Sequence, residues 1–156
     1  MTPMAPTRPN HPSTLPLPVA RHAFRIPLLA DLTAAASARA VVEDFIRAWR
    51  VPVDADVAVL LTSELVTNAV THGTKVTGES ILLAVACDAA MLRVDVHDGS
   101  GGLPVLDIAP ADAETGRGLL LVTSLSAEWG SYRTAVGKAV YFTLELQPGM
   151  TSRSVS

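Results

Sequence analysis

The sequence predicts an α+β fold: a two-layer sandwich in which a mixed, mostly antiparallel sheet is covered on one face by about three helices. Two observations predict this class. Apolar residues recur at helical spacing in two segments of the first half, whereas several shorter segments show the alternating or continuous apolar pattern of strands. The order is strand, two helices, two strands, helix, two strands, without an internal repeat.

The composition is that of one globular domain. With 156 residues, of which 49% are hydrophobic and 17% charged, the chain can bury a core and is too apolar for a disordered protein. The formal net charge is -3 and Lys and Arg form no run, which disfavours nucleic acid and an anionic membrane surface as direct partners. The single cysteine, Cys87, excludes a disulfide framework and fits a reducing cytoplasm.

The two ends of the chain are expected to lie outside the domain. Residues 1–21 contain six prolines and are interpreted as a disordered leader, residues 22–147 as the domain and residues 148–156 as a flexible tail. No stretch approaches the roughly 18 apolar residues of a membrane span, and the leader lacks the apolar segment of a secretory signal. A cytoplasmic protein is therefore predicted.

An edge strand and a helix open the predicted domain. In residues 22–29 apolar side chains alternate, and Pro27 suits an edge because proline cannot donate a hydrogen bond to a neighbouring strand. Residues 33–50 have helical periodicity, and Pro52 ends that helix.

A second helix and a hairpin follow. Asp54 is a suitable N-cap for a helix that runs to about Thr71 and is closed by Gly73. Residues 80–87 and 92–98 then have strand patterns and are separated by a tight turn, so they are expected to pair.

A long loop separates the hairpin from the end of the domain. Residues 99–115 lack periodicity and are long for an ordinary connection, which is typical of a lid. A short helix over residues 116–125 and strands over residues 128–134 and 138–146 complete the sheet.

Polar residues interrupt the apolar face of the second helix. At about 100° per residue, Glu64, Asn68 and His72 fall on the same face as Leu61 and Leu65. Burying a carboxylate and an amide without partners is costly, so a polar ligand is expected there. The Asn oxygen suits Mg²⁺, and a Glu one turn earlier can orient or deprotonate a hydroxyl. The alternatives are that Glu64 tilts toward solvent and that His72 only interacts with the helix dipole.

Asp98 is a second polar residue on an apolar face. It shares one side of its predicted strand with Leu92, Val94 and Val96. The other side of that strand carries Arg93, Asp95 and His97. A carboxylate in this place can accept a hydrogen bond from the exocyclic amine of adenine, and the glycines that follow leave room for a flat base. The alternative is an aspartate that caps its own turn.

A glycine-rich turn opens the last predicted helix. Thr115, Gly116, Arg117 and Gly118 precede Leu119. Uncrowded backbone amides at a helix start attract phosphate oxygens. An ordinary loop-to-helix turn is the alternative, but the place directly after a lid-length loop favours phosphate binding.

These pieces, in this order, resemble the Bergerat-type ATPases of gyrase, heat-shock chaperones, histidine kinases and mismatch-repair proteins. More narrowly, they resemble the stand-alone bacterial anti-sigma-factor serine/threonine kinases, over about residues 23–146. The matching motifs are SELVTNAVTH (63–72), VDVHDGSGGLP (94–104), TGRGLLLV (115–122) and GKAVYF (137–142).

The resemblance implies the histidine-kinase-like ATPase fold, ATP and Mg²⁺ as cofactors, and roles for single residues. Asn68 would coordinate the Mg²⁺ that bridges the phosphates, Glu64 would be the catalytic base for a protein serine, and Asp98 would recognise adenine. The other residues expected to bind the nucleotide are His72, Ser100, Gly102, Thr115, Gly116, Arg117, Gly118, Leu119 and Lys138.

Two positions depart from the family pattern. Ser100 stands where glycine is usual, and a serine would be strained there if the position needs a positive φ. Lys138 stands where threonine is common, which leaves one phosphate-side hydrogen bond unaccounted for.

The resemblance further implies an anti-sigma factor that phosphorylates a small anti-anti-sigma protein and sequesters a sigma factor. It also implies a homodimer, with the first helix and the edge strand as candidate surfaces. The alternative is a module without turnover in which ATP gates which protein is held, although the presence of both Glu64 and Asn68 favours the kinase. A histidine kinase is disfavoured because the proline-rich leader replaces its helical hairpin, and a purely structural domain would have to place three polar features by coincidence.

Overall fold

The computed structural model describes residues 20–73, 79–99, 114–147 and Gly149. The strands are β1 (His22–Leu29), β2 (Ser80–Cys87), β3 (Met91–Asp98), β4 (Glu128–Arg133) and β5 (Lys138–Glu145). The helices are α1 (Ala34–Trp49), α2 (Ala55–Asn68) and α3 (Glu114–Leu125), and a π-helical turn, η1 (Ala69–Gly73), continues α2. In the described part of the chain, no helix is long and apolar enough to cross a membrane.

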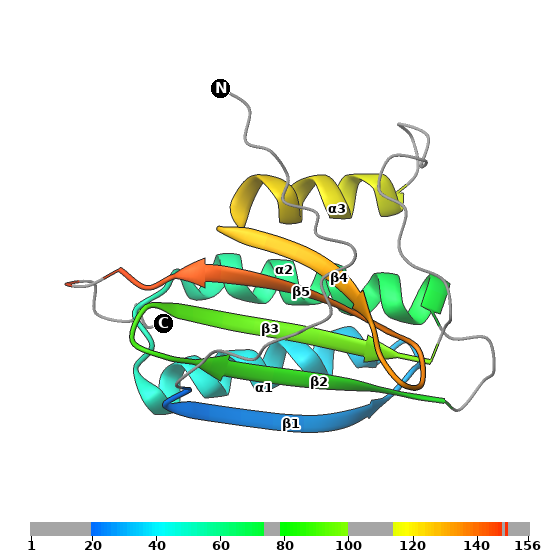
Figure 1. Ribbon diagram of the computed structural model, residues 1–156, viewed down its shortest axis with the longest axis horizontal. Coiled ribbons are helices and arrows are strands. Elements are labelled where there is room, and N and C mark those ends of the chain that lie inside the picture. Colours follow the sequence, from blue (N-terminus) through cyan, green and yellow to red (C-terminus); the bar gives the residue numbers. More distant parts are fainter. Residues whose placement is uncertain (1–19, 74–78, 100–113, 148, 150–156) are drawn as a thin grey trace.

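The five strands form one sheet in the order β1-β2-β3-β5-β4, and each pairing among them is antiparallel. The predicted two-layer α+β fold is confirmed, although these strands form an antiparallel sheet rather than the predicted mixed one. The path of the chain after β3 explains the difference. The chain passes through α3, β4 forms the outer edge, and β5 returns between β3 and β4, antiparallel to both (Figure 1).

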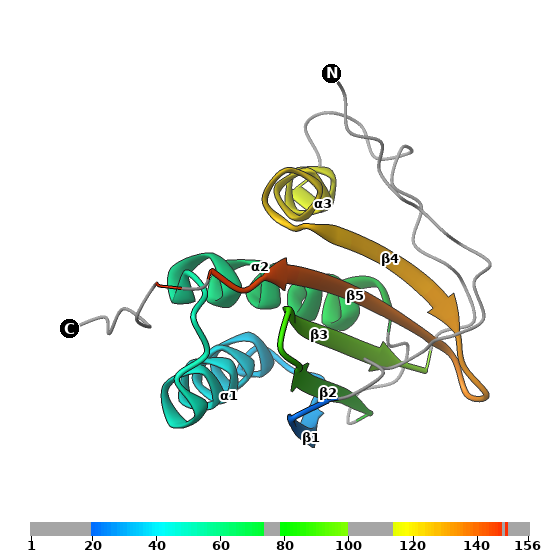
Figure 2. The ribbon, with the colours of Figure 1, turned by 60° about the vertical axis from the view of Figure 1, so that its left-hand side comes forward.

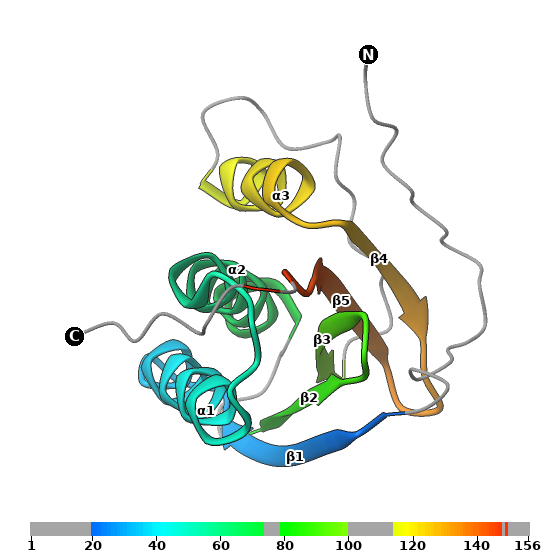
Figure 3. The same cartoon turned by 90° about the vertical axis from the view of Figure 1, so that its left-hand side faces the viewer.

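All three helices lie on one side of the sheet (Figures 2 and 3). Alternate residues of β2 are buried, so one face of the strand packs toward the helices. The core between the two layers includes the fully buried side chains of Leu61 and Leu65 from α2, Leu83 from β2, Leu92 from β3 and Phe142 from β5. No helix among the described residues covers the other face, which is therefore called the open face below.

The ends of the helices follow from local backbone chemistry. Arg50 terminates α1 in the left-handed conformation, with φ 52°. The carboxylate of Asp54 accepts hydrogen bonds from the backbone N–H groups of Asp56 (3.0 Å) and Val57 (3.2 Å), which confirms the predicted N-cap of α2.

The C-terminal end of α2 differs from the prediction of a regular helix to about Thr71. The α-helix ends at Asn68, and the π-helical turn over Ala69–Gly73 takes its place. Apolar periodicity does not report whether a backbone N–H bonds to the fourth or the fifth preceding carbonyl, so this change could not be predicted. Such turns are frequent at functional sites.

Some predictions fall on residues outside the described ranges. These are the leader over residues 1–19, most of the tail over residues 148–156 and most of the lid over residues 99–115. They remain predictions.

Candidate functional site

Four segments that carry predicted site residues meet at one end of the molecule (Figure 1). They are the C-terminal end of α2 with η1, the C-terminal end of β3, the first turn of α3 and the start of β5. Residues of η1 contact β3, and Asp98 is opposite Lys138 in the ladder between β3 and β5. Motifs that are far apart in the sequence are thus gathered in one region, which we call the α2–β3 end.

Asp98 is the most deeply buried acid of this region. It is 4% exposed and lies on the helix-facing side of β3, like the fully buried Val94 and Val96. The Nζ atom of Lys138 lies 3.2 Å from Oδ2 and 3.4 Å from Oδ1 of Asp98. A buried carboxylate needs such a partner, because an uncompensated charge in the interior is strongly destabilising. The alternation of the strand therefore predicted the place of Asp98, but not its ion pair with Lys138.

Gly137 brings the turn between β4 and β5 against the end of β3. A Cβ atom at this position would collide with the carbonyl oxygen of Asp98 and would lie 2.7 Å from the Cα of Gly99. Thr134 holds the turn, since its N–H donates to the Gly137 carbonyl (2.9 Å) and its hydroxyl accepts from the Gly137 N–H (3.0 Å). Only glycine permits this close approach, which fixes Lys138 opposite Asp98.

Glu64 and Asn68 lie one helical turn apart on α2, and both side chains are half-buried. Leu61 and Leu65, on the same face, are 0% and 2% exposed, so this face of α2 turns toward the core. The two polar side chains are therefore at the border of the core, as the helical spacing predicted, and not in bulk water.

His72 is exposed, and its predicted inward position is wrong. The prediction assumed one more α-helical turn after Asn68, whereas the π-helical turn over Ala69–Gly73 changes the angular spacing and rotates His72 out of line. A role of His72 in nucleotide binding stays a prediction.

The remaining predicted site residues are only partly described. Ser100 and Gly102 lie outside the described residues. The backbone of α3 begins at Glu114, so Thr115, Gly116, Arg117, Gly118 and Leu119 belong to the first turns of this helix. The helix thus begins before the predicted turn over residues 115–118 rather than after it, and its first turn at the α2–β3 end includes Gly116. Phosphate binding by this helix start stays a prediction.

The described residues contain no group of three His, Cys, Asp or Glu side chains that could hold a metal ion. Mg²⁺ needs no such group, because it retains waters and is usually bound through phosphates and few protein ligands. Asn68 as a single protein ligand beside a nucleotide is compatible with this chemistry.

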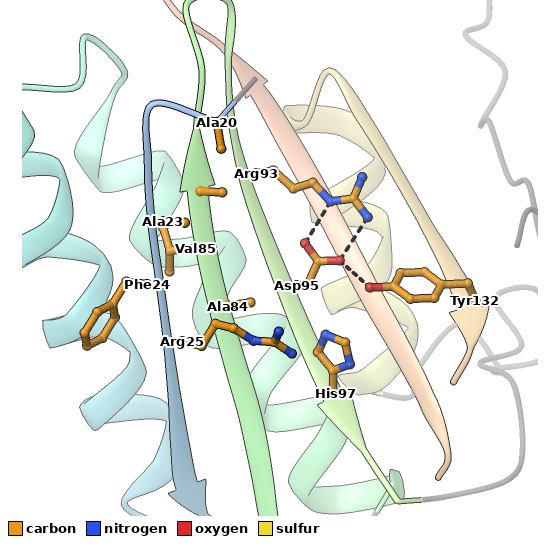
Figure 4. Close-up of a pocket in the computed structure, with 11 residues that line it drawn as sticks. Ala20, Ala23, Phe24, Arg25, Ala84, Val85, Arg93, Asp95, His97 and Tyr132 are labelled. Carbon is orange, nitrogen blue, oxygen red and sulfur yellow. Dashed lines mark hydrogen bonds and ion pairs between the residues drawn. The ribbon is translucent and has the colours of Figure 1, made fainter. Parts of the chain in front are cut away.

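A second polar cluster lies on the open face of the sheet (Figure 4). Arg93 donates two hydrogen bonds to Asp95, from Nε to Oδ1 (2.8 Å) and from Nη2 to Oδ2 (2.9 Å). The hydroxyl of Tyr132 donates to the same Oδ2 (2.7 Å), and the guanidinium carbon of Arg93 is 4.0 Å from the ring centre of Tyr141. The cluster joins β3 to β5 and β4, and we call it the open-face cluster.

The open-face cluster borders a cavity of about 330 Å³ whose lining includes alanines of β1 and β2 together with Arg25 and His97 (Figure 4). Burial lowers the pKa of His97, and the charge of Asp95 only partly offsets this effect. Burial, followed by the charge and the hydrogen bond of Asp95, raises the pKa of Tyr132. The neutral forms of His97 and Tyr132 are therefore favoured.

The open-face cluster could not be predicted as a unit from the sequence. The alternation of Arg93, Asp95 and His97 was visible in the sequence, but it is typical of a solvated strand face. The contact with Tyr132 depends on β5 lying between β3 and β4, which no spacing in the sequence specifies.

The fold and the polar residues at the α2–β3 end define a class of nucleotide-binding domain. A sequence profile of the family described as "Histidine kinase-like ATPase domain" matches residues 28–144. The chain belongs to this family, and ATP is the ligand that the family implies. No curated protein sequence matches the chain significantly.

A particular solved structure shares the fold. The chain aligns with "The crystal structure of the RsbU and RsbW domains of Rv1364c from Mycobacterium tuberculosis" at a TM-score of 0.63 and 23% sequence identity. The alignment covers 85% of this chain and 35% of that chain, so this chain spans about a third of the length of the other protein. At this level of identity the likeness concerns the fold alone.

Proposed function

We propose that the protein is an ATP-dependent regulatory kinase of the anti-sigma-factor type, acting in the cytoplasm. It transfers the γ-phosphoryl group of ATP to a serine or threonine of a small anti-anti-sigma protein. The observation that supports this proposal most is the gathering of Asp98, Asn68 and Glu64 at the α2–β3 end, each at least half-buried.

Asp98 is proposed to recognise the base. A carboxylate buried on the helix-facing side can accept a hydrogen bond from the exocyclic amine of adenine, and a charge-assisted bond of this kind is among the stronger ones in proteins. Lys138 orients the Asp98 carboxylate through contacts of 3.2 Å and 3.4 Å. In this proposal Lys138 belongs to the base pocket and not to the phosphate side, where the sequence pattern put it.

Asn68 and the start of α3 are proposed to serve the phosphates. Mg²⁺, when bound, neutralises phosphate charge, and the amide oxygen of Asn68 would be its protein ligand. The N–H groups of the first turn of α3, which contains Gly116, would donate to phosphate oxygens. Gly118 follows in the next turn. These groups hold the nucleotide in line for transfer, and positioning supplies most of the catalysis in phosphoryl transfer.

Glu64 is proposed to be the general base. In the transfer step the hydroxyl oxygen of the partner forms a bond to the γ-phosphorus, the bond from that phosphorus to the bridging oxygen of ADP breaks, and the hydroxyl proton moves to the Glu64 carboxylate. The half-buried position of Glu64, one turn before Asn68, suits this role because a partner hydroxyl can reach it.

The partners are part of the proposal. The kinase would hold a sigma factor in one state and the anti-anti-sigma protein in another, as a homodimer formed through α1 and β1. The similarity to the solved structure of RsbU and RsbW domains is in keeping with this assignment.

Transfer of labelled phosphate tests the proposed function. The protein is incubated with γ-labelled ATP, Mg²⁺ and candidate anti-anti-sigma proteins, and compared with Glu64→Gln and with Glu128→Gln, a half-buried glutamate of β4. We expect phosphoserine or phosphothreonine on the partner, a loss of about 10² to 10⁴-fold in Glu64→Gln with ATP binding retained, and no change in Glu128→Gln. ATP binding without any transfer would instead identify an ATP-gated binding module, and full transfer by Glu64→Gln would discard Glu64 as the base.

A further inference from the structure

A groove lies at the end of α2 that is remote from Asn68. It has a volume of about 370 Å³ and is bounded by the start of α2, the end of α3 and the end of β5. Its lining consists of Val53, Asp54, Val57, Leu125, Ala127, Leu144, Glu145 and Gln147. In Figure 1 this end of the molecule is opposite the α2–β3 end, and the last turn of α3 is the one nearer to it.

The α3 side of the groove exposes leucines. Among the α3 side chains that the structure describes, Val122 is fully buried, whereas Leu120, Leu121 and Leu125 are 62%, 36% and 41% exposed. Leu60 of α2 adds a further partly exposed leucine, three residues after Val57. Two helices that lie side by side thus present apolar side chains that neither of them covers (Figure 2).

The charged residues that line the groove have one sign. Asp54 and Glu145 are among the lining residues, whereas no Lys or Arg is among the described ones, and the exposed Asp56 follows Asp54 by two residues. The C-terminal end of α3 adds the partial negative charge of its carbonyl groups, and its last turn contains no basic residue. Asp54 caps α2 and thereby offsets the opposite partial charge of that helix start.

We propose that this groove is a docking site for a short amphipathic helix of a partner protein, with an apolar stripe flanked by Lys or Arg. The apolar stripe fits the exposed leucines of α2 and α3, and the basic flanks fit Asp54, Asp56 and Glu145. Pairing of a partner strand does not suit this place, because β5 already has β3 and β4 on its two edges.

The groove also connects partner binding to the nucleotide. The first turn of α3 contains the residues proposed to face the phosphates, and its last turn contains Leu125, so a shift of α3 on nucleotide binding changes the groove. This connection rests on the proposed function, whereas the docking site itself does not.

A designed peptide tests the docking site. The probe is a fluorescent 18-residue helix with a leucine stripe flanked by lysines, and the controls are the same composition scrambled and a version with glutamate in place of lysine. The proteins are the full chain, Leu125→Glu, Glu145→Lys, and Leu32→Glu as a matched control, since Leu32 is 97% exposed between β1 and α1. Binding is followed by fluorescence anisotropy, and circular dichroism verifies that each variant is folded.

We expect the lysine peptide to bind the full chain and Leu32→Glu equally, and at least about tenfold more weakly to Leu125→Glu and Glu145→Lys. Amide shifts in NMR spectra should fall on Leu125, Ala127 and Glu145. The proposal is overturned if both groove variants bind as the full chain does, or if the scrambled or glutamate peptide binds equally well. Because Glu145 is exposed, Glu145→Lys keeps the test decisive should Leu125→Glu fail to fold.

The experiment also distinguishes two other possible occupants of the groove, the tail of the same chain and a second copy of the chain. If the peptide binds only after residues 148–156 are removed, the tail of the same chain is the occupant and the proposal is wrong. If Leu125→Glu abolishes a concentration-dependent dimer in ultracentrifugation, a second copy is the occupant and the proposal is again wrong. A peptide affinity that is the same with and without Mg²⁺ and ATP overturns the connection through α3, whereas a lack of ATP binding overturns the proposed function.

Discussion

Each face of β3 has a buried carboxylate with a basic partner, and the two carboxylates differ in their contacts with these partners. On the open face, Asp95 accepts two hydrogen bonds from Arg93 at 2.8 Å and 2.9 Å and one from Tyr132 at 2.7 Å. On the helix-facing side, Asp98 has one Lys138 nitrogen at 3.2 Å and 3.4 Å from its two oxygens. The contacts between Arg93 and Asp95 are thus short and bidentate, whereas the contacts between Lys138 and Asp98 are longer.

The difference is in keeping with a structural role for Asp95 and with the proposed role of Asp98 in recognising the base. The bidentate guanidinium and the tyrosine hydroxyl fix Asp95 in one geometry and connect three strands, which suits a sheet stabiliser. A lysine nitrogen is a flexible point charge that can shift when a ligand arrives, so the Asp98 pair suits a site that must accept a base. We therefore expect changes at Asp95 to alter the stability of the fold and changes at Asp98 to alter nucleotide binding.

The largest effect is expected from removing the partner of Asp95. Arg93→Met should lower the free energy of unfolding by about 3–5 kcal/mol, because it leaves a nearly buried carboxylate without its main counterion. Urea denaturation measures this. The control is Arg47→Met, whose ion pair with Asp44 is on the surface and should change stability by less than about 0.5 kcal/mol. Equal losses of unfolding free energy in Arg93→Met and Arg47→Met would show that the open-face cluster does not stabilise the fold.

The next effect concerns nucleotide affinity. Asp98→Asn should weaken ATP binding by about 10- to 100-fold in calorimetry, because the charge-assisted hydrogen bond to the base is lost. Asp95→Asn should lower the stability and leave ATP affinity unchanged. Equal ATP affinity of Asp98→Asn and the unmodified protein would contradict the proposal that Asp98 recognises the base.

A smaller effect is expected from a single hydroxyl group. Tyr132→Phe should lower the free energy of unfolding by about 1 kcal/mol, since it removes one hydrogen bond to Asp95. Folding raises the pKa of the Tyr132 hydroxyl, so the hydroxyl loses its proton at a lower pH in the unfolded chain than in the folded one. The free energy of unfolding should therefore fall as the pH rises through about 10. This fall should be smaller in Tyr132→Phe, and an identical pH profile would contradict the raised pKa.

The smallest effect on stability is expected from the titration of His97. Burial lowers its pKa, so the unfolded chain binds the proton more readily and stability should fall as the pH drops below about 6.5. The difference between the unmodified protein and His97→Gln in urea melts from pH 7.5 to 5 isolates this contribution. His72→Gln, which replaces an exposed histidine outside the cavity of the open face, is the control substitution.

Much of the fold could be predicted from the sequence because its signals are local. Alternation identified β3 and the inward side of Asp98, and the chemistry of Asp54 identified the start of α2. The antiparallel order of the sheet could not be predicted, because it depends on where β5 inserts after α3.

The candidate site was predictable in its parts but not in its contacts. Helical spacing placed Glu64 and Asn68 correctly at the border of the core, and it failed for His72 because the π-helical turn changes the hydrogen-bond pattern. The ion pair between Asp98 and Lys138 and the bond from Tyr132 to Asp95 join residues about forty positions apart, and only the pairing of the strands brings these residues together.

The most direct test of the nucleotide assignment is a crystal structure with Mg²⁺ and a non-hydrolysable ATP analogue. We predict that the exocyclic amine of the base lies within hydrogen-bonding distance of the Asp98 carboxylate, and that the phosphates lie between Asn68 and the first turn of α3. A nucleotide bound on the open face beside Arg93 and Tyr132, with no contact to Asp98, would contradict the proposed nucleotide site.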